Sequence, residues 1–129
     1  MHKIGTNNTS IRVIAFDLDG VLCRRDVEGT SIEKYRSCQP IKEMIEIINR
    51  CYGEGYHIVI YTARGMTTFS GDTSAIYSNL YELTVNQLRE WKIKFHQLVM
   101  GKIHYDLLID DKAVCSDKIT SINDIMGRL

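Results

Sequence analysis

The chain has 129 residues, of which 44% are hydrophobic, and its 16 basic side chains balance its 16 acidic ones. This length suits one domain over 1–129 and leaves no room for a separate cap domain. The balanced charge argues against a protein that binds nucleic acid or an acidic membrane surface, and it favours a small partner.

Four cysteines are spread along the chain without a Cys-x-x-Cys pair: Cys23, Cys38, Cys51 and Cys115. The sequence contains no signal peptide and no membrane-spanning stretch, so we expect a cytoplasmic protein with reduced thiols and no membrane partner. A zinc site is not expected, because tetrahedral zinc sites use closely spaced ligand pairs.

The run from Val13 to Phe16, followed by Asp17-Leu18-Asp19-Gly20, predicts a buried strand with two acids at its end. Residues two apart in a strand share a face, so Asp17 and Asp19 are expected to crowd like charges together. That arrangement costs free energy unless a cation compensates. The alternative is that the two aspartates only stabilise a turn through local hydrogen bonds.

The following residues predict a helix and a second strand. Residues 1–10 indicate a polar leader, and residues 23–39 indicate a charged loop or small hairpin that leaves the acidic strand end. Apolar residues spaced three and four apart predict a helix over 41–51 with Pro40 in its first turn. Residues 56–61 predict a second buried strand, and this order predicts a right-handed parallel crossover.

Helices and strands are also expected to alternate in the second half of the chain. Residues 76–91 carry one apolar helical face, but Thr84 with Gln87 resembles a capping box, which leaves one helix or two open. A third strand is expected over 95–100 and a fourth over Asp106 to Ile109, and residues 119–129 predict a last helix with a capping box at Ser121 and Asp124. Together these elements predict an α/β fold, a three-layer Rossmann-like parallel sheet with helices on both faces.

Polar side chains follow the expected strands and form the candidate site. They are Asp17, Asp19, Thr62, Arg64, Lys102, Asp110 and Asp111. Ligands bind outside the carboxyl ends of parallel strands, so these residues are expected to meet there. Two or three carboxylates suit Mg²⁺, which shares its coordination with a substrate phosphate. The hydroxyl and guanidinium at the second strand end suit an anion such as phosphate.

This ordered set resembles the haloacid dehalogenase superfamily of aspartate-nucleophile phosphatases, from Val13 to Val114. The resemblance implies that Asp17 is the nucleophile and Asp19 the general acid and base. It implies that Thr62 and Lys102 hold the phosphoryl group. The implied metal site consists of Asp17, Asp19 and Asp110, with Asp111 beside it. As a general acid, Asp19 needs an environment that holds its proton more tightly than free aspartate does.

Within the superfamily, residues 61–66 and Gly101-Lys102 are similar to the small capless phosphatases encoded with bacterial capsule and surface-polysaccharide genes, although Ile103 stands where that group usually has proline. The resemblance implies a sugar or polyol phosphate as substrate, with Arg64 as a substrate contact. A nucleotide or polynucleotide phosphatase is the enzyme alternative, disfavoured by the lack of net positive charge.

Two alternatives are not enzymes. A phospho-receiver signalling module also uses acids, a threonine and a lysine around Mg²⁺, but its adjacent acids follow the first strand, whereas here they come last. A catalytically silent sugar-phosphate-binding protein is the other. We also expect a homo-oligomer, because no cap covers the site and residues 119–129 carry an apolar stripe.

Overall fold

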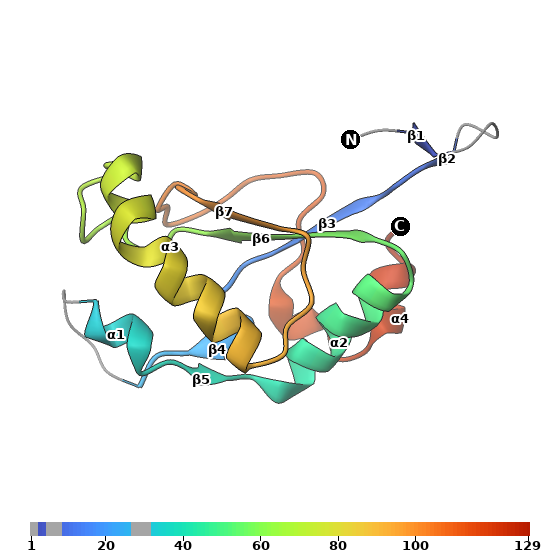
Figure 1. Cartoon of the computed structure of the whole chain (residues 1–129). Helices are drawn as coiled ribbons and strands as arrows, with labels where there is room; N and C mark the ends of the chain where they lie inside the picture. The colour runs from blue at the N-terminus through green and yellow to red at the C-terminus, as the bar shows by residue number, and fades with distance from the viewer. Residues whose placement is uncertain (1–2, 5–8, 27–31) are drawn as a thin grey trace.

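A computed structural model describes residues 3–4, 9–26 and 32–129, which form a mixed α/β fold around a parallel three-stranded sheet (Figure 1). The strands are β3 (Val13–Phe16), β6 (His57–Thr62) and β7 (Gln97–Met100), in the order β3-β6-β7. Val13 pairs with His57, and Val59 pairs with Gln97. Because both pairs are parallel, the three carboxyl ends meet at one edge of the sheet.

The two long helices are the crossover connections. Helix α2 (Lys42–Gly53) packs against β6, and α3 (Thr73–Glu90) packs against β7. The predicted helix over 41–51 is confirmed, but Pro40 lies before it in β5 rather than in its first turn. The sequence left open whether this region forms one helix or two. Residues 73–90 form a single helix, which is capped by the Asp72 side chain.

Short elements complete the chain. Strands β1 (Lys3–Ile4) and β2 (Thr9–Ser10) pair antiparallel in the predicted leader, whose other residues lie outside the described ranges. Strands β4 (Cys23–Arg24) and β5 (Gln39–Pro40) form the small hairpin expected over 23–39, with α1 (Glu33–Arg36) before β5; residues 27–31 are outside the description. A 3-10 turn, η1 (Ser116–Lys118), precedes α4 (Ile122–Met126), which keeps the predicted capping box but is shorter than 119–129.

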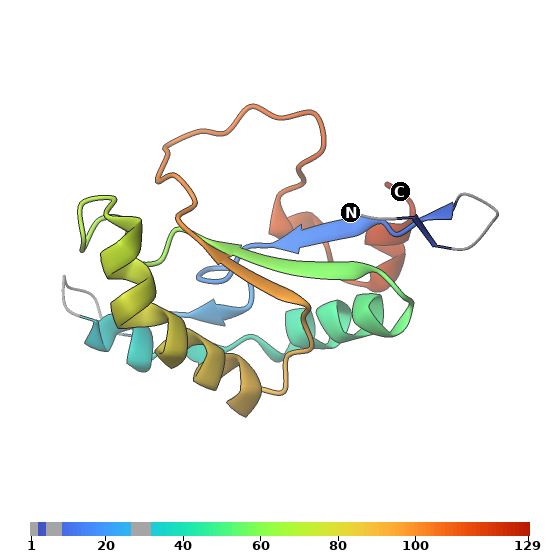
Figure 2. The same cartoon turned by 45° about the horizontal axis from the view of Figure 1, so that its top comes forward.

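The sheet has one covered face. Side chains alternate along each strand, so Phe16, Ile60 and Met100 are buried whereas Val13 and Tyr61 are exposed. Helices α2 and α3 lie on the same side, and residues 101–115 pass over the other side (Figure 2). Two crossovers of the same hand that advance in the same direction place both helices on one face. The described part of the chain therefore lacks the second layer of long helices that the sequence predicted.

The predicted fourth strand over Asp106 to Ile109 is wrong. These residues form no strand in the described structure, and Leu107 and Ile109 are 77% and 90% exposed. The Lys112 amide instead donates to the Asp110 side chain at 2.9 Å, a local hydrogen bond that competes with an extended ladder. As a result β3 is an edge strand of the sheet, and the acidic pair lies in an exposed loop.

Candidate active site

The chain turns sharply where β3 ends. The amides of Leu22 and Cys23 donate to the Leu18 carbonyl oxygen at 2.8 and 3.3 Å, and Gly20 takes a φ of +89°, which glycine adopts without strain. Because of this turn, the side chains no longer alternate between the two faces of the strand after Asp17. The expected crowding of Asp17 with Asp19 is therefore not found, since the two side chains face different partners.

Asp17 lies beside Lys102. The Lys102 Nζ atom is 3.4 Å from Asp17 Oδ2, and the Lys102 amide donates to the Thr62 carbonyl oxygen at 3.1 Å. The Asp17 side chain is 38% exposed and that of Lys102 is 15% exposed. Burial would lower the pKa of Lys102, but the charge of Asp17 and the contact with Tyr105 together outweigh it, so the pKa is raised. A solvent-accessible carboxylate thus sits next to a fixed positive charge.

Asp19 points inward and pairs with Arg64. Arg64 donates from Nε to Asp19 Oδ2 at 3.1 Å and from Nη2 to Oδ1 at 3.0 Å, the two-pronged geometry that carboxylates prefer. Burial would raise the pKa of Asp19, but the charge and hydrogen bonds of Arg64 outweigh it and hold the pKa below its usual value. This is the opposite of what a general acid needs.

The rest of the Arg64 guanidinium is also occupied. Nη1 donates to Thr84 Oγ1 at 3.0 Å and to Gln87 Oε1 at 2.6 Å, and the Tyr35 ring centroid lies 5.0 Å from the guanidinium carbon. The residue is only 1% exposed. We therefore assign Arg64 to the positioning of Asp19, in place of the substrate contact that the resemblance implied.

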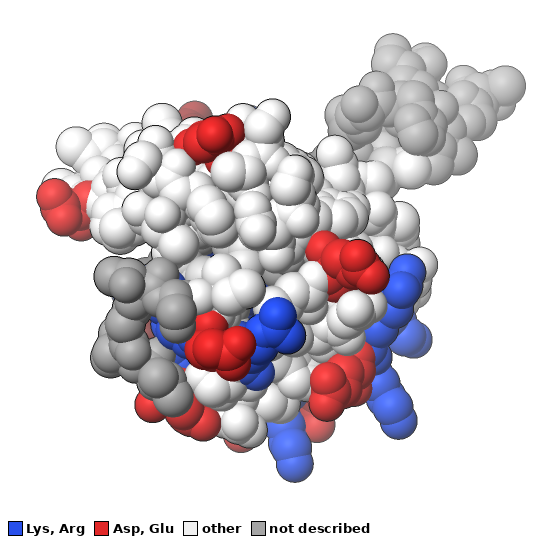
Figure 3. Space-filling model, turned by 60° about the vertical axis from the view of Figure 1, so that its left-hand side comes forward, with Lys and Arg blue, Asp and Glu red and all other residues white. Residues whose placement is uncertain are grey.

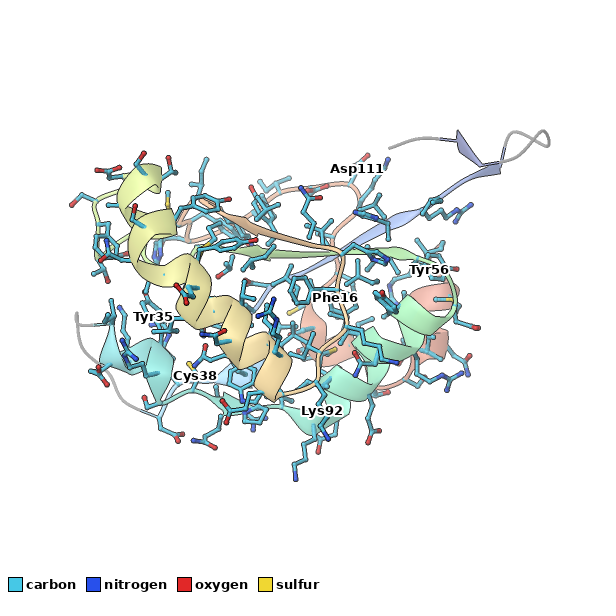
Figure 4. The ribbon with its side chains drawn as sticks, in the orientation of Figure 1. Phe16, Tyr35, Cys38, Tyr56, Lys92 and Asp111 are labelled. Carbon is cyan, nitrogen blue, oxygen red and sulfur yellow. The ribbon has the colours of Figure 1, made fainter. Side chains whose placement is uncertain are left out.

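Two cysteines complete this buried cluster. Cys23 and Cys38 each donate a thiol hydrogen bond to Asp19 Oδ1, at 3.4 and 3.5 Å, and both sulfurs lie within 3.8 Å of Arg64 Nη2. The neighbouring thiol is the main influence on each of them: Cys38 raises the pKa of the Cys23 thiol, and Cys23 lowers the pKa of Cys38. Figure 4 labels Cys38 and Tyr35 on the segment that passes beneath α3. Neither thiol takes part in a disulfide in the described structure.

Thr62 is buried at the end of β6 and is 1% exposed. Its Oγ1 accepts a hydrogen bond from the Arg64 amide at 3.0 Å, and Tyr35 Oη accepts one from the Gly65 amide at 2.9 Å. These bonds fix the turn that aims Arg64 at Asp19. The described contacts thus give Thr62 a role in shaping this turn, whereas the resemblance implied phosphate binding.

The acids do not assemble into the expected magnesium site. Within the described ranges, the acidic, cysteine and histidine side chains placed closely enough to share an ion are Asp19, Cys23 and Cys38; this group contains neither Asp17 nor the exposed loop acids Asp110 and Asp111. Both Asp19 oxygens are bound to Arg64, and thiols are poor ligands for Mg²⁺. The arrangement as described does not fit Mg²⁺.

The surface next to Asp19 is open and mixed in charge. A depression of about 340 Å³ is lined by Asp19, Gly20, Arg24 and Arg25. Over the face drawn in Figure 3, acidic and basic side chains are interspersed rather than gathered by sign. Among the described helices, none combines the length and apolarity that a membrane crossing requires.

Sequence reasoning missed Tyr35, Thr84 and Gln87 as site residues, along with the two cysteines. One signal was available for Thr84. It continues the four-residue spacing of Ile76 and Leu80 on the buried face of α3, and a polar residue in an apolar stripe indicates a buried polar partner. No comparable pattern marked Tyr35.

Comparison with known proteins supports the fold. No protein-family model and no curated protein matches the chain. A crystal structure of a structural-genomics target from Vibrio cholerae is similar, with 26% identity and a TM-score of 0.79 over 92% of this chain and 96% of that one. Its description gives no activity. The similarity supports an α/β fold along nearly the whole chain.

Proposed function

We propose that this protein is a phosphomonoester hydrolase that acts on a small phosphorylated metabolite, with Asp17 as its nucleophile. The observation that carries the proposal is the pair of Asp17 and Lys102 at the carboxyl edge of the sheet, 3.4 Å apart, with the carboxylate partly open to solvent. Parallel sheets bind ligands at this edge, and a carboxylate is one of the nucleophiles used in covalent phosphoryl transfer.

In the proposed reaction, Asp17 attacks phosphorus and the bond to the alcohol oxygen breaks, so that the carboxylate becomes an aspartyl phosphate. The leaving oxygen takes up a proton from solvent, and water then attacks the intermediate, releases phosphate, returns a proton to solvent and restores Asp17. Lys102 counters the negative charge of the phosphoryl group throughout. Asp19 enters as a carboxylate, because its lowered pKa makes it a poor proton donor.

Mg²⁺ belongs to the proposal only through the resemblance to haloacid dehalogenase phosphatases. The described acids do not fit it, so no step is assigned to the metal, and the assay below tests its requirement directly.

A sugar or polyol phosphate for bacterial capsule or surface-polysaccharide synthesis is the substrate class proposed, in a cytoplasmic enzyme. The interspersed charges support a small substrate over a polynucleotide, which binds chiefly through phosphate contacts to basic residues.

One observation favours a second candidate, a phosphometabolite-binding protein without turnover. Asp19 is tied to Arg64 through both oxygens and cannot act as the acid that the resemblance assigns to it. Such a protein would bind a phosphate ester at Asp17 and Lys102 and release it unchanged.

The deciding experiment is a phosphate-release screen over sugar, polyol and nucleotide monophosphates, with Mg²⁺ and with excess chelator. Steady turnover of one ester supports the hydrolase, whereas binding without release supports the second candidate. Turnover that persists in chelator would remove Mg²⁺ from the proposal and leave Asp17 and Lys102 in place.

A further inference from the structure

Cys23 and Cys38 are arranged as a buried dithiol. Cys23 pairs with Pro40 across the β4–β5 hairpin, and Cys38 stands directly before β5, so the hairpin brings the two cysteines close together. The two sulfur atoms and an Asp19 oxygen all lie within 4.8 Å of one another. A disulfide needs the sulfurs at about 2 Å, so the two side chains must move toward each other for the bond to form.

The same three residues do not suit a metal ion. Arg64 Nη2 lies 3.0 Å from Asp19 Oδ1 and 3.8 and 3.6 Å from the two sulfurs, so the guanidinium already occupies the position between the three ligands. A cation placed there would meet the charge of Arg64 at short range. The chemistry left to the two thiols is therefore their own oxidation.

We propose that Cys23 and Cys38 form a reversible disulfide when the protein meets a peroxide. Cys38 reacts first, because it keeps 5% exposure whereas Cys23 has none. Its sulfur takes one oxygen from hydrogen peroxide to give a sulfenic acid and water. The Cys23 sulfur then displaces that hydroxyl group to form the S–S bond and a second water. The two sulfurs thus give two electrons to the peroxide.

The route to the thiols runs through Asp19. The depression lined by Asp19, Gly20, Arg24 and Arg25 leaves the Asp19 side chain 12% exposed, and Asp19 Oδ1 contacts both sulfurs directly. The disulfide removes both thiol donors from this oxygen and leaves Arg64 as its side-chain partner. If the proposed hydrolase activity holds, oxidation changes the electrostatics of the site through Asp19.

The test is intact-mass spectrometry of the reduced protein before and after one equivalent of hydrogen peroxide. The expected result is a loss of about 2 Da, from two hydrogens, reversed by dithiothreitol. A digest of the alkylated product should contain a linked peptide that joins Cys23 to Cys38. This peptide is sought in the wild-type chain, so the result does not depend on a variant that folds.

Matched variants assign the bond. Cys51→Ser with Cys115→Ser should keep the mass loss, whereas Cys23→Ser and Cys38→Ser should each abolish it. A mass gain of oxygen without the linked peptide, or a linkage to Cys51 or Cys115 in place of the pair, would overturn the proposal. These readouts need no activity, so they separate a failure of this proposal from a failure of the proposed function. In an active enzyme, phosphate release should fall on oxidation and return with dithiothreitol.

Discussion

Asp17 and Asp19 stand two residues apart in the chain, yet each carboxylate faces its own cation, Lys102 at 3.4 Å and Arg64 at 3.0 Å. The first pair lies at the surface and the second inside the protein. This division separates the proposed nucleophile, Asp17, from a residue that forms a buried ion pair, and substitutions should distinguish the two.

Asp17→Asn should abolish the release of phenol from an aryl phosphate, without an initial burst, because the proposed nucleophile is lost. Its free energy of unfolding should stay within about 0.5 kcal/mol of the wild type, since the residue is partly exposed. Stopped-flow absorbance and urea denaturation measure the two quantities. Asp117→Asn, on the exposed 3-10 turn, is the matched control and should keep full activity. A burst from the Asp17 variant would contradict its role.

Asp19→Asn should lower the free energy of unfolding by about 3–5 kcal/mol, because it leaves the buried Arg64 charge unpaired. Urea denaturation measures the loss. Glu33→Gln breaks the exposed Arg36–Glu33 pair, whose side chains are 55% and 69% exposed, and should cost less than about 1 kcal/mol. Combining Asp19→Asn with Arg64→Met should cost less than the sum of the single changes. Additive losses would show that the two residues are not coupled.

Lys102→Met should reduce kcat/KM for the phosphate ester by about 10²–10³-fold, since the fixed charge beside the proposed nucleophile Asp17 is lost. Lys112→Met removes an exposed charge from the same loop and should leave the rate unchanged. Steady-state kinetics on both variants, with circular dichroism to check the fold, measures the effect. Equal losses in the two variants would point to general electrostatics of the loop.

Gly65→Ala should destabilise the protein by about 1–3 kcal/mol, because a Cβ at this position would lie 2.6 Å from Leu80 Cδ1 and the backbone has a φ of +83°. Gly71 is a matched control with a φ of +76°, where a Cβ would be 4.0 Å from Met66 Cε. Gly71→Ala thus carries the backbone strain without the clash. Thermal unfolding should give Gly65→Ala a lower melting temperature than Gly71→Ala. Equal melting temperatures would show that the contact between Gly65 and Leu80 is not tightly packed.

The stability of the protein should fall as the pH is lowered below about 6.5, in part through His96. The Ile58 amide donates to His96 Nδ1 at 2.9 Å, and the His57 ring stacks on it with centroids 4.7 Å apart. Burial, followed by the charge of His57, lowers the pKa of His96. The unfolded chain therefore binds the proton first, and stability is lost between the unfolded and folded pKa values.

Urea titrations at pH 7.5 and 5.5 should show this loss in the wild type and a smaller one in His96→Asn. His104→Gln, in the exposed loop, is the control and should behave as the wild type. An unchanged pH dependence in His96→Asn would exclude this histidine as the source.

Local sequence patterns predicted the strands around Val13, Ile58 and Leu98 and the two crossover helices, because each pattern reports on its own neighbourhood. They failed where the outcome depends on distant segments. The apolar residues Leu107 to Ile109 indicate a strand, but a strand also needs a neighbour to pair with, and no local pattern specifies one.

The candidate site divides in the same way. That Asp17 and Lys102 lie together at the carboxyl edge follows from the parallel topology. That Asp19 turns inward follows from a backbone turn at Leu18 and from acceptors on α3, which lie 20 and 23 residues beyond Arg64. Periodicity in the sequence contains no information on whether a distant arginine will bind Asp17 or Asp19.

The contacts of Arg64 have a consequence for the order of folding. They join Asp19, the Tyr35 ring, Thr84 and Gln87, and the bond to Asp19 spans 45 residues of chain. The guanidinium is enclosed only after the turn behind β3, the segment before β5 and α3 have all come together. Contacts that form after the rate-limiting step affect the unfolding rate and leave the folding rate unchanged. We therefore expect the contacts of Arg64 to form late in folding. Arg64→Met should raise the unfolding rate in a chevron experiment and leave the refolding rate unchanged.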